Sequence, residues 1–117
     1  MTQAHENEDT DVLHLTEHTF DETLSTAEGI LMVDFWAQWC GPCRAVSPVL
    51  EELAGQSDGA VTLAKVNVDE EPRLAQRFGI RSIPTILFAK DGKIVDQVVG
   101  AVPRAQLQAR LTALTKG

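Results

Sequence analysis

Residues 30–43 read ILMVDFWAQWCGPC, and this stretch predicts both the centre of the fold and the place of its chemistry. Its first half is almost continuously apolar, which is typical of a strand covered on both faces in a parallel or mixed sheet. We therefore expect residues 30–36 to form the central strand. The end of the stretch holds Cys40 and Cys43, the only cysteines of the chain, as a single C-x-x-C pair. Apolar residues then recur at helical spacing as far as Leu53, so we expect a helix to continue from the pair.

The segments on either side alternate between strand and helix patterns. Before the stretch, Thr19 and Glu22 are spaced as a capping box, which predicts the start of a short helix. After it, Asp91-Gly92 is a strong hairpin signal and predicts that the flanking strands pair antiparallel. The expected elements are a strand near 12–15, a helix over 20–24, the strand 30–36, a helix over 43–53, a strand at 61–68, a helix over 74–78, strands at 85–89 and 93–99, and a helix opened by Pro103. This βαβαβαββα order indicates an α/β fold, in which a mixed sheet of about five strands is flanked by about four helices.

The composition is that of one globular domain. With 117 residues, 44% of them hydrophobic and 23% charged, the chain is long enough to bury a core. The net charge of −7 argues against nucleic acid as a ligand, because phosphate backbones attract a surplus of Lys and Arg. No secretory signal and no apolar run of about 18 residues is present, so we expect a cytoplasmic protein without membrane attachment. Residues 1–10 are polar and acidic and are expected to form a flexible tail before a domain at 11–117.

The spacing of the two cysteines favours chemistry over cross-linking. Residues i and i+3 on a first helical turn lie about 5–6 Å apart at Cβ, so a disulfide closes with little adjustment. As a structural cross-link, a disulfide that closes a loop of about four residues stabilises the folded state by only roughly 2 kcal/mol. The free N–H groups and positive dipole end of a helix N-terminus favour a thiolate on Cys40. We expect Cys40 to attack a substrate disulfide and the less exposed Cys43 to resolve the mixed disulfide.

Three other interpretations of the C-x-x-C pair differ in the residues that they require. A zinc site would need a second pair of ligands, and the only histidines, His5, His14 and His18, lie in or near the tail, so no metal site is expected. An inert buried pair is disfavoured because Gly and Pro between the cysteines keep the loop open. A C-x-x-C domain that serves only as a binding scaffold stays open as an alternative.

Asp34 is the one charged residue in the central apolar run. If it is buried, desolvation raises its pKa and makes it a candidate acceptor for the proton of Cys43. If it lies at a strand end, it faces solvent and has no such role. Lys65, on a neighbouring strand, is either its counter-ion or simply exposed. The residues alone leave both pairs of alternatives open.

Three motifs together resemble the thioredoxin family. They are DFWAQ at 34–38, WCGPC at 39–43 and IPT at 83–85. The resemblance covers roughly residues 12–114 and implies the thioredoxin fold, whose order of elements is similar to the order expected above.

The resemblance also implies roles for the site residues. Cys40 is similar to the attacking cysteine of the family and Cys43 to the resolving one. Asp34 resembles the buried carboxylate that assists deprotonation of Cys43, with Lys65 as its neighbour. Gly41-Pro42 matches the reducing version of the motif.

A substrate-binding rim is a further implication of the resemblance. Pro84 resembles the cis proline that lies beside the cysteines in this family, although only about 5–6% of X–Pro bonds are cis in general. An extended client segment is then expected to dock on an apolar rim around Cys40. The rim would consist of Trp39, Gly41, Pro42, Val68, Ile83, Pro84, Val99, Gly100 and Ala101.

The function implied is that of a monomeric protein-disulfide reductase. It binds no cofactor, because no nucleotide-binding motif is present and reducing equivalents are expected to come from NADPH through a flavin enzyme, thioredoxin reductase. By resemblance its clients include ribonucleotide reductase, peroxiredoxins and methionine sulfoxide reductases. The alternatives are a redox-independent binding module that uses the same rim, and a disulfide isomerase or oxidant.

Overall fold

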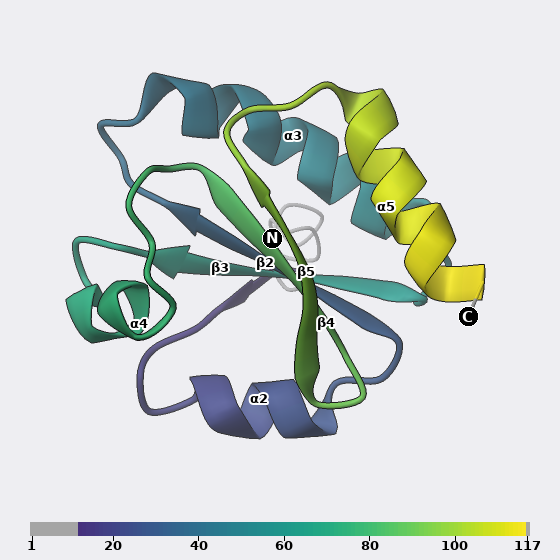
Figure 1. Cartoon of the computed structure of the whole chain (residues 1–117), viewed down its shortest axis with the longest axis horizontal. Helices are drawn as coiled ribbons and strands as arrows, with labels where there is room; N and C mark the ends of the chain where they lie inside the picture. The colour runs from purple at the N-terminus through teal and green to yellow at the C-terminus, as the bar shows by residue number, and fades with distance from the viewer. Residues whose placement is uncertain (1–11, 117) are drawn as a thin grey trace, which may run out of the picture.

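The chain folds around a five-stranded sheet with the strand order β1-β3-β2-β4-β5. The computed structural model describes residues 12–116, and the tail predicted at 1–10 lies outside them. The elements are β1 (Val12–His14), α2 (Phe20–Thr26), β2 (Ile30–Trp36), α3 (Gly41–Gly55), β3 (Val61–Asn67), α4 (Pro72–Arg77), β4 (Thr85–Lys90), β5 (Lys93–Val99) and α5 (Arg104–Lys116). Their order confirms the predicted βαβαβαββα pattern and the α/β class (Figure 1).

Strand β2 lies at the centre of the sheet, as its apolar run predicts. It pairs parallel with β3 and antiparallel with β4, so the sheet is mixed. Helices α3 and α5 cover one face of the sheet, and α2 and α4 cover the other (Figure 1). Both faces of β2 are therefore packed: Ile30 and Met32 contact the α3 and α5 side, and Leu31 and Val33 contact the α2 and α4 side. Because side chains alternate along a strand, Asp34 belongs to the face covered by α3.

A predicted hairpin turn and a predicted helix cap have different outcomes. The hairpin between β4 and β5 forms at Asp91 and Gly92, whose φ angles of 55° and 79° are those of a tight primed turn. The capping box is wrong in its detail. Thr19 is the residue before α2, but its side chain does not cap the helix, and its Oγ1 instead accepts from the N–H of Thr16 at 3.0 Å. The preceding loop thus offers Thr19 a nearer donor than the helix does.

Helix α3 begins directly after Cys40 and runs through Pro48 without interruption. Pro42 lies in its first turn, where a missing N–H costs no helical hydrogen bond. Among residues 12–116, no helix is both long enough and apolar enough to cross a membrane.

Candidate active site

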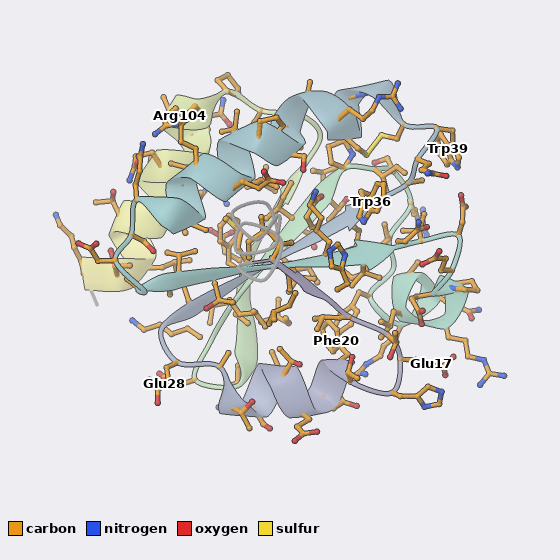
Figure 2. All side chains as sticks on the ribbon, turned by 180° about the vertical axis from the view of Figure 1, so that it is seen from behind. Glu17, Phe20, Glu28, Trp36, Trp39 and Arg104 are labelled. Carbon is orange, nitrogen blue, oxygen red and sulfur yellow. A yellow bond between two sulfur atoms is a disulfide. The ribbon has the colours of Figure 1, made fainter. Side chains whose placement is uncertain are left out.

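The two cysteines are joined at the N-terminus of α3. A disulfide links Cys40 and Cys43, whose Cα atoms are 5.3 Å apart. Cys40 is the N-cap residue, and its Sγ accepts from the backbone N–H of Cys43 at 3.2 Å. Figure 2 shows the disulfide as a yellow bond beside Trp39, at one end of the molecule. A sulfur in this position is favoured as a thiolate, because it receives a helix N–H and faces the positive end of the helix dipole.

Exposure does not distinguish the two sulfur-bearing residues in the closed state. Cys40 is 4% exposed and Cys43 is 2% exposed. The expected difference has the predicted sign, but it is too small to decide which cysteine attacks. The assignment of Cys40 as the attacking residue therefore depends on its N-cap position.

Asp34 is completely buried, which resolves the alternatives that the sequence leaves open. Its side chain is 0% exposed, and neither carboxylate oxygen has a hydrogen-bond partner in the described part of the chain. Burial raises the pKa of Asp34 to about 7, while Lys65 acts to lower it and Glu51 to raise it further. A carboxyl group with this pKa exchanges a proton readily near neutral pH.

A small pocket brings Asp34 and Cys43 together. Its volume is about 70 Å³, which is room for one or two water molecules. The lining residues are Asp34, Trp36, Cys43, Arg44, Ser47 and Lys65. The indole N–H of Trp36 is also buried without a partner in the described structure. The pocket therefore offers unpaired polar groups between which a water molecule could carry a proton.

Lys65 is a member of this site and is not an exposed strand residue. It is paired with Asp34 in the register of β2 and β3, and its side chain is 13% exposed. Its ammonium group, however, donates to Ser47 Oγ, lies 3.7 Å from a carboxylate oxygen of Glu51 and stands 5.6 Å from the ring centroid of Trp36. Ser47 and Glu51 were not identified from the sequence. The sequence did contain a signal for them: residues 43, 47 and 51 are spaced by four, which places Ser47 and Glu51 on the same face of α3 as Cys43.

Part of the predicted rim lies against the cysteine pair, where Val68 and Ile83 pack on Cys40 and Cys43, and its members differ in exposure. Trp39 is 68% exposed and Val99 is 51% exposed. Gly41, Pro42 and Ala101 are exposed as well, whereas Val68, Ile83 and Gly100 are partly buried. Pro84 is buried, so it supports the rim from below and is not part of its surface.

Backbone contacts join the segments that form the rim. The carbonyl oxygen of Ile83 lies 3.8 Å from Cys40 Sγ, and the Ile83–Pro84 peptide bond is cis, as the resemblance implies. The N–H of Gly100 donates to the Pro84 carbonyl at 2.8 Å, which brings the end of β5 to the same place.

An apolar groove of about 410 Å³ opens next to the disulfide. Three residues of the predicted rim line it, namely Trp39, Val68 and Ile83, and the rest of its lining is Ala75, Ile80, Arg81 and Ser82. Val99 lines an adjoining hollow of about 260 Å³, which shares Ile80, Arg81 and Ser82 with the groove. Gly100 and Ala101 line neither space.

Trp39 is held in place by a residue that sequence reasoning missed. Its indole N–H donates to the carboxylate of Asp69 at 2.8 Å. The N–H of Asp69 in turn donates to Asn67 Oδ1 at 2.9 Å, which orders the turn after β3. An exposed tryptophan is thereby fixed at the edge of the groove.

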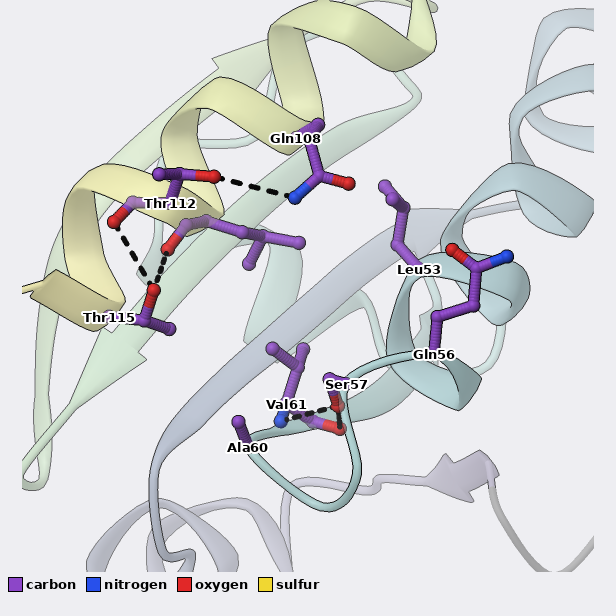
Figure 3. A pocket seen from close by; sticks show the side chains of 9 residues that line it. Leu53, Gln56, Ser57, Ala60, Val61, Gln108, Thr112 and Thr115 are labelled. Atoms are coloured by element: carbon purple, nitrogen blue, oxygen red, sulfur yellow. Dashed lines mark hydrogen bonds between the residues drawn. The ribbon is translucent and has the colours of Figure 1, made fainter.

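A second hollow, between the end of α3 and α5, is remote from this chemistry (Figure 3). Its volume is about 280 Å³, and the end of α3 lies roughly 18 Å along the helix from Cys43. Its polar groups bond mainly to one another: Ser57 Oγ accepts from the N–H of Val61 at 3.0 Å, and Gln108 donates to Thr112 at 3.4 Å (Figure 3). The Ser57–Val61 contact supports the connection between α3 and β3, whereas the Gln108–Thr112 contact lies within α5. Within residues 12–116, no three His, Cys, Asp or Glu side chains gather as a metal site would require.

Comparisons with known proteins agree with this geometry. The thioredoxin family model matches residues 11–113 of the chain. A protein named thioredoxin 2 from Chlorobaculum tepidum is 49% identical over 96 residues, which cover 82% of this chain and 88% of that protein. Thioredoxin 1 from a Nostoc species is 48% identical over 97 residues, covering 83% and 91%. The solved structure of a mutant thioredoxin from Halobacterium salinarum matches with a TM-score of 0.81 and 35% identity, covering 89% of this chain and 90% of that one.

Proposed function

Because the chain belongs to the thioredoxin family and is a thiol–disulfide oxidoreductase with the thioredoxin fold, we propose that Cys40, Cys43 and Asp34 carry its reaction. The protein reduces protein disulfides by dithiol–disulfide exchange and binds no cofactor itself. Its partners are disulfide-containing client proteins and a reductase. The observation that carries the assignment of roles is the cysteine pair at the start of α3, with the unpaired carboxylate of Asp34 on the wall of the pocket that Cys43 also lines.

In the first step, the Cys40 thiolate attacks one sulfur of a client disulfide. The client S–S bond breaks, a bond forms between Cys40 and the client, and the other client sulfur leaves as a thiolate. The backbone N–H of Cys43, which donates to Cys40 Sγ in the closed state, stabilises the attacking thiolate before this step.

In the second step, Cys43 releases the client. Its thiol gives a proton to Asp34 through the shared pocket, and the resulting thiolate attacks Cys40 Sγ. The mixed disulfide breaks, the second client thiolate leaves, and the Cys40–Cys43 disulfide remains. The client has then gained two electrons, which a reductase must return to the pair.

The groove beside the disulfide is the proposed client site. Extended client segments bind across Trp39, Val68 and Ile83 and meet the backbone near Pro84, so that main-chain contacts accommodate many sequences. Gly100 and Ala101 border this route. The proposed clients are ribonucleotide reductase, peroxiredoxins and methionine sulfoxide reductases, enzymes whose own cysteines become oxidised during turnover.

The proposed setting is the cytoplasm, where an NADPH-dependent flavin enzyme, thioredoxin reductase, recharges the pair. The Gly41-Pro42 dipeptide supports this, since it matches the reducing version of the motif and a reductant works in a reducing compartment. One chain supplies every residue of the proposed site, so a monomer suffices for the reaction.

The reduction potential tests the proposed function. We expect a value near the one general for thioredoxins, about −270 mV, when the protein is equilibrated in dithiothreitol buffers and followed by the fluorescence of Trp36 and Trp39. A value near −180 mV would correspond to a pair about a thousandfold more oxidising, at 29.6 mV per tenfold change. That result would identify an isomerase or oxidant and would contradict the proposal.

Removal of the Asp69 carboxylate should weaken client binding. In Asp69→Ala, Trp39 loses its hydrogen bond, and the KM for insulin reduction is expected to rise about fivefold, because one such bond is worth about 1 kcal/mol. The kcat should change little. Asp69→Asn keeps an acceptor oxygen and should behave as the wild type, and Glu70→Ala serves as the exposed neighbouring control. Equal KM values for Asp69→Ala and wild type would remove Asp69 from the client site.

A further inference from the structure

The Lys65 ammonium group is held by α3 and not by the carboxylate beside it. Although Lys65 is paired with Asp34 in the sheet, its ammonium donates to Ser47 Oγ and forms an ion pair of 3.7 Å with Glu51. The Ser47 hydroxyl in turn donates to the same Glu51 oxygen at 3.4 Å. Both oxygens of Asp34 remain without a hydrogen-bond partner in the described structure. The Lys65 ammonium therefore lines the same pocket as Asp34 without forming a hydrogen bond to its carboxylate.

This cluster leads from the interior to the surface. Asp34 is completely buried, the Lys65 side chain is 13% exposed, Ser47 is partly buried, and the Glu51 side chain is 52% exposed. Ser47 and Lys65 both line the pocket that contains Asp34 and Cys43. Ser47 and Glu51, both on the helix that carries Cys43, thus hold the ammonium group of the lysine on β3.

We propose that Ser47 is a positioning residue: its hydroxyl, together with Glu51, fixes the Lys65 ammonium at the wall of the Asp34 pocket and so sets how readily Asp34 takes the proton of Cys43. This inference rests on the proposed role of Asp34 as the base. It adds Lys65 as the group that adjusts the basicity of Asp34, and Ser47 as the contact that holds Lys65 in place.

Among the groups around Asp34, the contact between Lys65 and Ser47 is the one that a substitution can change. From α3, Arg44 also lines the pocket, but its guanidinium donates to the carbonyl of Gln38 at 2.5 Å. From β4, the residue paired with Asp34 is the apolar Ile86. The charged groups that act on Asp34 are accordingly Lys65, which lowers its pKa, and Glu51, which raises it.

The direction of the effect follows from the geometry. Without the Ser47 hydroxyl, the Lys65 ammonium loses an acceptor, and the unpaired oxygens of Asp34 become the alternative within the same pocket. A closer cation stabilises the charged carboxylate and lowers its pKa. Loss of the Glu51 charge acts in the same direction, because it removes a nearby negative group. Ser47→Ala and Glu51→Gln should therefore both lower the pKa of Asp34.

The test is the titration of Asp34 in the oxidised protein, followed by the ¹³C signal of its carboxyl group, in a state in which neither cysteine titrates. We expect the midpoint to fall by at least about half a pH unit in Ser47→Ala and in the exposed-site variant Glu51→Gln. Ser47→Thr keeps the hydroxyl and should titrate as the wild type. Glu52→Gln is the matched control, because the neighbouring Glu52 carboxylate pairs with Arg104 and not with Lys65.

A kinetic measurement completes the test. At pH 8.5, where Asp34 is ionised in both proteins, Ser47→Ala should resolve a mixed disulfide on Cys40 up to about threefold more slowly, the factor that half a pH unit represents, and Ser47→Thr should restore the rate. A wild-type midpoint in Ser47→Ala, or the same shift in Ser47→Ala and Ser47→Thr, would overturn the inference. The proposed role of Asp34 fails separately, if Asp34→Asn resolves the mixed disulfide as fast as the wild type.

Discussion

A Cys40→Ser variant is expected to lose disulfide reduction completely, whereas a Cys43→Ser variant should remain joined to its clients through a mixed disulfide. Cys40 is the N-cap residue whose sulfur receives the helix N–H, so its removal takes away the nucleophile of the first step. Cys43 acts only in the second step, and without it the client cannot be released. Insulin reduction measures the first variant, and non-reducing gel electrophoresis with mass spectrometry measures the second.

The double variant Cys40→Ser/Cys43→Ser is the control for covalent capture. It keeps the groove at Trp39 and Ile83 but has no thiol, so it should retain no client after washing. If Cys40→Ser still reduces insulin and Cys43→Ser traps no client, then Cys43 attacks first and Cys40 resolves the mixed disulfide. Strong retention by the double variant would instead support a binding module that works without redox chemistry.

An Asp34→Asn variant is expected to be more stable than the wild type above neutral pH and slower in releasing clients. In the folded protein the pKa of Asp34 is raised from 3.8 to about 7, so the folded state keeps a proton that the unfolded chain has already lost. The free energy of unfolding of the wild type should fall by about 1.4 kcal/mol per pH unit through this window, and then level off. The whole loss is on the order of 4 kcal/mol, and the asparagine variant should not show it.

Urea unfolding at pH 4 and pH 8 measures this difference. The two proteins should have similar stability at pH 4, and Asp34→Asn should be the more stable at pH 8. The exposed Asp58→Asn variant is the control and should follow the wild type at both pH values. In stopped-flow experiments at pH 7, Asp34→Asn should resolve a mixed disulfide on the order of a hundredfold more slowly, as expected for loss of a general base. Equal pH dependence in Asp34→Asn and wild type would show that another group causes it.

Local patterns were sufficient to predict the elements and their order. The apolar run at 30–36 is typical of a strand packed on both faces, and Asp91-Gly92 specifies a turn through the φ angles of its own two residues. The cysteine pair is similarly local, because its spacing and its place before a helix determine both the disulfide and the favoured thiolate. The capping box predicted at Thr19 does not form, for a related reason: a short hydroxyl side chain bonds to whichever donor is nearest, and the loop residue Thr16 supplies it.

The sequence by itself thus determined the α/β order, the C-x-x-C site and, by resemblance, the family. The tertiary structure alone decided that Asp34 is buried and unpaired, because this depends on α3 lying over that face of β2. It also decided that Lys65 binds Ser47 and Glu51, and that Asp69 holds Trp39. These contacts join residues from different elements, and periodicity along one segment carries no information about which side chain of another segment lies against it. The pKa of a buried group depends on such neighbours, so the chemistry of Asp34 could be assessed only in the folded chain.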